Sequence, residues 1–226
     1  MRHLHESTPT FSDWEGVHDA VADAYFPHAL RPRSEGSAAR SELEVVDLSL
    51  VRVAHIRFGA TVDISTDHAG AVAINLQLRG SMESVLGGTS VTTEPGQAAI
   101  FPADTPARLP AWTPDSDVLG LRVDEDYLAR ESERVLARKG LVLPRVVDLS
   151  GPEGRAWVAM ARTTLRNARD CGGVLYRDPR VAESVSSMLV TGLLLAAVPE
   201  DSLTSTRPRP VHRAVEAMEA DPSRPW

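Results

Sequence analysis

Residues 72–102, VAINLQLRGSMESVLGGTSVTTEPGQAAIFP, decide the fold of this chain. Apolar side chains alternate with small or polar ones from Val72 to Arg79, which is the pattern of a half-buried strand. Gly87-Gly88 divides the residues that follow into two short runs and predicts a tight hairpin, and Glu94-Pro95-Gly96 predicts another turn. Short strands separated by closely spaced Gly and Pro turns are typical of an antiparallel sandwich or barrel.

The period-two pattern continues on both sides of this stretch. Residues 45–58 are rich in β-branched side chains up to Gly59 and predict a strand, and residues 107–109 and 118–123 predict two more. Helical spacing takes over outside this region. We predict helices near 12–24, from Asp124 or Asp126 to about 138, over 154–170, and from Asp178-Pro179 to about 198.

The order of these elements predicts an α+β chain. We expect an N-terminal arm with a short helix at 1–42, a barrel at 43–123, a helical segment at 124–198, a linker at 199–210 and one more helix at 211–226. The last helix carries an apolar face but has no neighbouring element to cover it. We therefore expect it to open a second domain that this sequence does not include.

Composition limits the classes of function. The 226 residues are 42% apolar, enough for a real core, and carry a formal net charge of −7. An acidic chain is a poor nucleic-acid binder by itself, because phosphate binding needs a basic surface. The single cysteine, Cys171, excludes an internal disulfide, and the sequence shows neither a secretory signal nor an apolar run of membrane-spanning length. We expect a cytoplasmic protein with no membrane partner.

Two stretches carry a resemblance to a known family. The hairpin and turn at Leu76–Gly80, Gly87-Gly88 and Glu94–Pro102 resemble the cupin-like sensor domain of arabinose-regulator (AraC/XylS) transcription factors. Residues 211–222, VHRAVEAMEADP, are similar to the helix that opens the DNA-binding domain of those proteins. The resemblance implies a cupin-like antiparallel barrel, or double-stranded β-helix, followed by helices. It also implies a small-molecule effector, a homodimer, and DNA contact only through a helix-turn-helix domain absent from this sequence.

The barrel region contains few residues suited to metal or covalent catalysis. Only His55 and His68 occur between residues 43 and 123, they form no His-x-His pair, and Ala107 stands where metal cupins often have histidine. A metal site needs about three converging protein ligands, so we expect no metal and no cofactor. The sequence has no Gly-x-Ser-x-Gly elbow, and no histidine lies near Cys171. We therefore do not expect an enzyme.

Effector contacts are predicted at a few polar or aromatic side chains: His55, Arg57, Gln77, Arg79 and Trp14. An arginine on a strand can bind an anionic effector through two hydrogen bonds, and His55 alternates with Val51 and Val53, which predicts an interior position. The alternatives stay open. The arginines can lie on the solvent face, His55 can be a hydrogen-bonded core or rim residue, and Trp14 can attach the arm to the barrel instead of covering a pocket.

The helix before residue 198 is apolar around most of its circumference. Such a helix is buried on two sides, one of which could meet a second subunit. We assign the partner-facing side to Val190, Leu193, Leu194 and Ala197, with burial between the barrel and the helix at 154–170 as the alternative. The function predicted overall is the effector-sensing and dimerisation portion of a transcription regulator. Two rivals remain, a cupin-fold small-molecule enzyme and a standalone binding module that acts through mixed dimers.

Overall fold

Two antiparallel sheets facing each other make up the barrel of this chain, whose computed structural model describes residues 9–137 and 139–198. One sheet has five strands in the order β1-β4-β9-β6-β7, and the other has six in the order β11-β8-β5-β10-β3-β2. The strands are β1 (Ala29–Pro32), β2 (Glu42–Asp47), β3 (Val51–Arg57), β4 (Val62–Thr66), β5 (Ala71–Arg79), β6 (Met82–Leu86), β7 (Thr89–Thr93), β8 (Gln97–Phe101), β9 (Ala107–Trp112), β10 (Asp117–Asp124) and β11 (Val146–Asp148).

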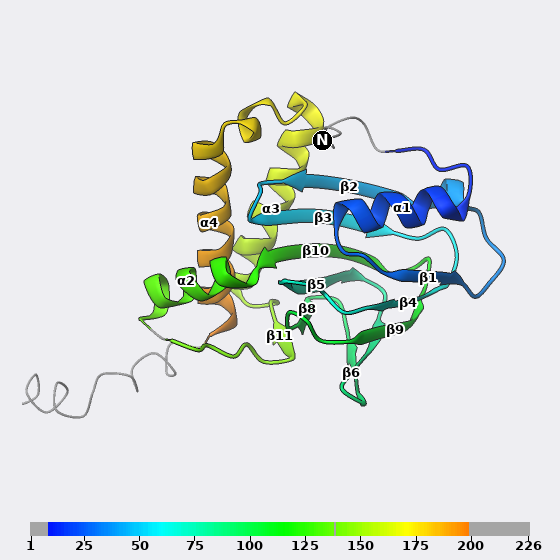
Figure 1. Cartoon of the computed structure of the whole chain (residues 1–226), viewed down its shortest axis with the longest axis horizontal. Coiled ribbons are helices and arrows are strands. Elements are labelled where there is room, and N and C mark those ends of the chain that lie inside the picture. The colour runs from blue at the N-terminus through cyan, green and yellow to red at the C-terminus, as the bar shows by residue number, and fades with distance from the viewer. Residues whose placement is uncertain (1–8, 138, 199–226) are drawn as a thin grey trace, which may run out of the picture.

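The helices lie on two sides of the barrel (Figure 1). They are α1 (Trp14–Ala24), α2 (Glu125–Leu136), α3 (Pro152–Cys171) and α4 (Pro179–Ala197), with short 3-10 turns η1 (Ala38–Arg40) and η2 (Val174–Arg177). Figure 1 shows α2, α3 and α4 grouped together at one side of the strands, while α1 lies at the other side. The predicted α+β class, with helices that follow most of the strands, is confirmed.

Both faces of the six-stranded sheet are buried, and this organises the molecule. On β5 the side chains of Val72, Ile74 and Leu76 belong to the core shared with the helices, whereas Ala71 and Ala73 belong to the core between the sheets. A sheet covered on both faces has continuous apolar strands, which is why β5 is buried from Ala71 to Gln77. The chain therefore has two hydrophobic cores separated by one sheet.

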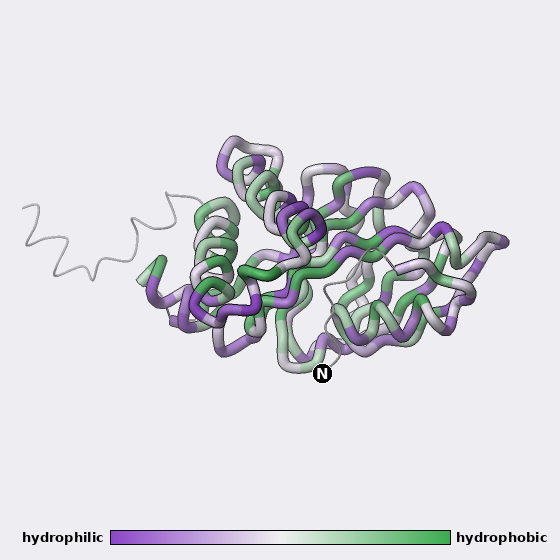
Figure 2. Tube along the Cα trace, turned by 90° about the horizontal axis from the view of Figure 1, so that it is seen from above, coloured by the Kyte–Doolittle hydropathy of each residue, from purple (hydrophilic) through white to green (hydrophobic). Residues whose placement is uncertain are grey.

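Helix α4 is the central element of the helical core. It is long and apolar enough to cross a membrane by length and composition alone. Its apolar character is explained by burial, because the side chains of Leu189, Val190, Leu193 and Leu194 are completely covered by the rest of the chain. Figure 2 shows hydrophobic colouring along this helix and along the strands that run through the middle of the molecule.

The predicted subunit interface on α4 was assigned to the wrong side of the helix. Val190, Leu193, Leu194 and Ala197 all pack into the helical core of their own subunit, so the alternative of internal burial holds. The outward side instead carries Met188 and Leu195, which are 47% and 50% exposed. Both sides of the helix are apolar in sequence, and the side that faces inward is fixed by contacts with α2 and α3.

Several local predictions need correction. The run at 45–58 is a hairpin of two strands, because Ser49 adopts a left-handed conformation (φ 71°) and reverses the chain between β2 and β3. Helix α2 ends at Leu136, where Ala137 is left-handed, and does not continue toward Gly140. Strands β1, β4 and β11 are additions that the sequence patterns did not indicate. The predicted linker and final helix at 199–226 lie outside the described residues.

Candidate functional site

The inner face of the six-stranded sheet carries a row of small side chains. The strand registers place Gly120 of β10 opposite Ala54 of β3 and Asn75 of β5, and Asn75 opposite Ala99 of β8. Only one of these four residues, Asn75, reaches beyond a methyl group. This row therefore leaves space on the barrel side of the sheet that another part of the chain can fill.

Tyr25, the residue that ends α1, fills part of that space. Its ring packs on Gly120 so closely that a Cβ atom at position 120 would lie 2.9 Å from the ring. Its hydroxyl lies 2.9 Å from Oδ1 of Asn75 and 3.2 Å from the carbonyl oxygen of Leu121. Burial raises the pKa of Tyr25 far above its ordinary value, so the hydroxyl stays neutral and donates.

The next three residues continue this insertion, and we call Tyr25 to His28 the plug. The Phe26 ring is buried against Tyr25 and the ring of His68. The carbonyl oxygen of Pro27 accepts a hydrogen bond from Oγ1 of Thr66 at 2.9 Å, and that of His28 lies 2.9 Å from Nε2 of His18 on α1. The plug is thus fixed by side-chain contacts at each end and leads directly into β1.

A small cavity remains between the plug and the two sheets. Its free volume of about 30 Å³ can hold a water molecule but no metabolite. The wall combines apolar side chains with polar groups from both sheets and from the plug. The lining residues are Val21, Tyr25, Phe26, His28, Ile56, Ile64, Thr66, His68, Asn75, Leu109 and Trp112.

Three nitrogen atoms on the cavity residues have no hydrogen-bond partner within the described part of the chain. They are Nε2 of His28, Nδ1 of His68 and Nε1 of Trp112. His68 and Trp112 are only 2% and 3% exposed, and a buried polar group without a partner costs about 1–3 kcal/mol. Native cores seldom carry several such groups together, so this cluster is the strongest indication of a ligand site.

His68 is the most perturbed residue of the cluster. Burial lowers the pKa of its imidazole to about 4, so the ring is neutral near pH 7. The ring stacks on Phe101 at 4.8 Å between centroids, and the backbone of His68 is left-handed with φ 53°. A non-glycine residue in that conformation costs free energy, and such strain is concentrated at functional positions.

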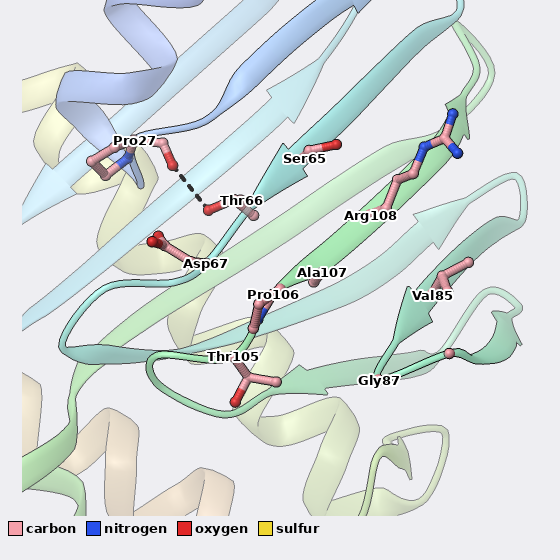
Figure 3. A pocket seen from close by; sticks show the side chains of 11 residues that line it. Pro27, Ser65, Thr66, Asp67, Val85, Gly87, Thr105, Pro106, Ala107 and Arg108 are labelled. Carbon is pink, nitrogen blue, oxygen red and sulfur yellow. Dashed lines mark hydrogen bonds between the residues drawn. The ribbon is translucent and has the colours of Figure 1, made fainter.

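A wide groove on the outside adjoins the cavity (Figure 3). It has a volume of about 780 Å³, within the range of small-molecule sites, and the turn at Gly87-Gly88 forms one side of it. Pro27 and Thr66 line the groove, and Figure 3 shows the hydrogen bond between them. Thr66 also lines the inner cavity, so the Pro27–Thr66 contact lies at the boundary between groove and interior.

His55 and Arg57, two of the predicted effector residues, lie on the face of the six-stranded sheet that points toward the helices. Val51 and Val53 belong to the helical core, whereas Ala54 and Ile56 face the barrel, so His55 points toward the helices. The predicted interior position of His55 is therefore wrong. Its Nε2 lies 2.5 Å from Oδ1 of Asp117, and Arg57 pairs with Glu42 at 3.1 Å.

The remaining predicted residues are dispersed. Gln77 is fully buried on the barrel side of β5, with its amide nitrogen donating to the carbonyl oxygen of Arg79 at 2.9 Å. Arg79 itself is exposed at the end of β5. Trp14 is partly buried at the start of α1 and packs against the barrel core, which agrees with a role in attaching the arm. None of these three residues lines the cavity.

The described residues do not include a cluster of three or more His, Cys, Asp or Glu side chains suited to a metal ion. Cys171 is an exposed free thiol at the end of α3. The residues around the cavity offer hydrogen bonding and aromatic contact.

A family model of the AraC-binding-like domain matches residues 17–195. The chain belongs to this family. The matched residues include α1 from its fourth residue, the plug and both sheets, and the resemblance seen in residues 76–102 is confirmed. No curated protein matches the chain.

The fold of this AraC-binding-like domain also occurs in a solved structure. The AraC-like transcriptional activator CuxR is 13% identical, with a TM-score of 0.55 over 94% of this chain and 79% of that chain. Two cupin structures match smaller parts at a TM-score of 0.35. They are the Cnp3 cupin domain of Schizosaccharomyces pombe (9% identity, 42% of this chain, 70% of that chain) and KdgF from Halomonas sp. (20%, 43% and 88%). The predicted cupin-like barrel followed by helices is confirmed.

The residues that sequence analysis missed are the plug, Asn75 and Trp112. Two signals were available. Asn75 is a polar residue inside the apolar run at 72–78, and Tyr25-Phe26 is an aromatic pair directly after a predicted helix. Neither signal shows that Tyr25 contacts Asn75, because this contact depends on the strand register that places Gly120 beside Asn75.

We predict that His68 makes this domain acid-sensitive. The histidine titrates near 6.5 in the unfolded chain and at about 4 in the folded one, so the unfolded chain binds the proton first as the pH falls. The stability gained by keeping His68 neutral is complete above pH 6.5 and is lost toward pH 4, by about 3 kcal/mol. Urea unfolding at a series of pH values would show a smaller loss for His68→Gln than for wild type. Parallel stability curves would contradict the assignment.

Proposed function

We propose that this AraC-binding-like domain binds a small organic effector inside its barrel and passes the signal on as a dimer. The observation that carries the proposal is the set of unpartnered nitrogens on His28, His68 and Trp112 around one interior cavity. A ligand with both donor and acceptor atoms would satisfy these groups, because Nε1 of Trp112 donates, whereas Nε2 of His28 accepts while its Nδ1 donates to the carbonyl oxygen of Phe26. Binding to the folded state would also stabilise the domain. The role is recognition, without metal or covalent catalysis.

The size of the cavity implies that the plug moves when the effector binds. A free volume of about 30 Å³ is too small for a metabolite, whereas removing Tyr25 and Phe26 would add the volume of two aromatic side chains. The outer groove at Pro27 and Thr66 provides the approach from solvent. Effector binding is therefore coupled to the position of α1, which precedes the plug directly.

Dimerisation is supported by apolar side chains on the surface of the helical layer. Among the described residues, four of the five large hydrophobic side chains that are exposed lie in η2 or α4: Val174, Leu175, Met188 and Leu195. A groove of about 380 Å³ between α3 and α4 is lined by Met160, Tyr176 and Met188 among others. Exposed apolar surface of this kind marks an association site, most simply with a second copy of the chain.

In the regulator that we propose, this domain controls a DNA-binding domain that follows it in a cytoplasmic protein. The crystal structure of CuxR is that of an AraC-like transcriptional activator, and its likeness to this chain supports the regulatory setting. The acidic composition supports the view that this portion does not bind DNA itself.

A thermal-shift screen of small metabolites tests effector binding. We expect a stabilising compound whose affinity falls about tenfold or more in Trp112→Phe and in His68→Phe, because each variant keeps an aromatic ring and removes its hydrogen-bonding nitrogens. Ser84→Ala is the matched control, since Ser84 is another buried unpartnered polar residue of the barrel that does not line the cavity. Binding unaffected by the two cavity variants would contradict the site. Chemical conversion of the bound compound, detected by mass spectrometry, would favour an enzyme.

Glutamate substitutions on the two sides of α4 test the dimer. Met188→Glu introduces a charge on the exposed side and should give a folded monomer, whereas Leu194→Glu buries an unpaired charge and should prevent folding. Val142→Glu is the control, because Val142 is exposed but lies outside the helical layer. Sedimentation and circular dichroism distinguish these results. A monomeric wild type at micromolar concentration would refute the dimer.

A further inference from the structure

Arg122 is an unpaired cation on the barrel side of β10. It lies two residues from Gly120 on the same strand, and so on the same face of the sheet. Its neighbour across the register, Arg52, pairs with Asp47 at 3.1 Å and donates to the carbonyl oxygen of Asp23. Arg122 makes no ion pair or side-chain hydrogen bond with the described residues. Its guanidinium instead lies 5.2 Å from the ring centroid of Phe26.

The environment of Arg122 favours a bound anion. Burial, followed by the neighbouring charge of Arg52, lowers the pKa of Arg122 from its ordinary value, while Asp124 and Asp47 oppose this from a distance. A carboxylate in contact with the guanidinium would satisfy a charge that is now covered only by an aromatic ring. Contact with the Arg122 guanidinium would therefore contribute favourable free energy to the binding of an anionic ligand.

Phe26 connects this cation to the ligand cavity. The same ring lines the cavity, meets Arg122 on its face and lies 4.9 Å from the ring of His68 at an interplanar angle of 78°. Withdrawing the ring would extend the cavity to the guanidinium. The opened site would present one cation and the nitrogens of His68 and Trp112 around a space the size of a benzyl group.

We infer that Phe26 is an internal stand-in for the effector, and that the effector is a small carboxylic acid with a benzyl-sized apolar body. The apolar part takes the place of the Phe26 ring, and the carboxylate binds Arg122. This inference rests on the proposed effector-binding function and adds the chemical class of ligand to it. Binding involves no covalent step.

Competition between Phe26 and the ligand has a measurable consequence. In wild type only the fraction of molecules with Phe26 withdrawn can bind, so the apparent affinity is reduced by that fraction. Removing the ring abolishes the competition and leaves a benzyl-sized space, and a cavity left by a deleted aromatic side chain takes up molecules of matching size. The Phe26→Ala variant should therefore bind more tightly than wild type.

Calorimetric titration of the purified Phe26→Ala chain with phenylacetate and with 2-phenylethanol tests the inference. The two compounds share the benzyl group and differ in charge. We expect phenylacetate to bind Phe26→Ala at least about tenfold more tightly than 2-phenylethanol, and more tightly than it binds wild type. Adding Arg122→Gln should abolish the preference for the anion. Adding Arg79→Gln, a change at an exposed arginine of the same sheet, should leave it intact.

Equal affinity for the two compounds, a preference that survives Arg122→Gln, or no binding of either compound would overturn the ligand class. If Phe26→Ala does not fold, the wild-type chain gives the answer, because phenylacetate should raise its melting temperature and Arg122→Gln should remove that rise. Failure of the ligand class is distinguishable from failure of the proposed function. A neutral compound whose binding still depends on His68 and Trp112 would retain the effector site and refute only the anion.

Discussion

The contact between the Tyr25 ring and Gly120 is the constraint on which the site depends. The glycine at this register position allows the hydroxyl end of the Tyr25 ring to approach the inner face of the sheet closely, and the hydrogen bond to Asn75 fixes that end. With the Tyr25 ring in this position, the next residue, Phe26, enters the barrel, and the preceding helix α1 lies against the side of the barrel. The lack of a side chain at Gly120 is therefore what allows the plug to close the interior of the barrel.

The six-stranded sheet joins this closed interior to the surface proposed for dimerisation. Its two faces belong to different cores, and α2 contacts both β10 and β5, so a displacement of either strand on the barrel side would be transmitted to α2 and from there to α4. The His55–Asp117 pair lies on that second face. Burial alone would raise the pKa of the Asp117 carboxyl, but the hydrogen bond with His55 holds that pKa below its ordinary value, so Asp117 is a carboxylate that joins β10 to β3 on this face.

Sequence patterns identify most of the strands, the four helices and the family, because alternation and turn residues are local properties. They do not identify the side of a strand when both faces are buried. His55 alternates with Val51 and Val53, but those valines pack on the helices and not in the barrel. The same ambiguity affects α4, which has apolar side chains on two sides. Its contacts with other helices bury Leu194 and leave Leu195 half exposed. The cavity was not predictable, since it joins residues from five separate elements through strand register.

A Gly120→Ala variant examined by hydrogen exchange tests the central claim that the plug is a separable part of the fold. The added methyl group would lie 2.9 Å from the Tyr25 ring, which must shift. We expect the amides of α1 and the plug to exchange at least about tenfold faster, while those of α3 keep their protection, because α3 belongs to the second core. Unchanged exchange in α1, or an equal loss of protection in α1 and α3, would contradict it.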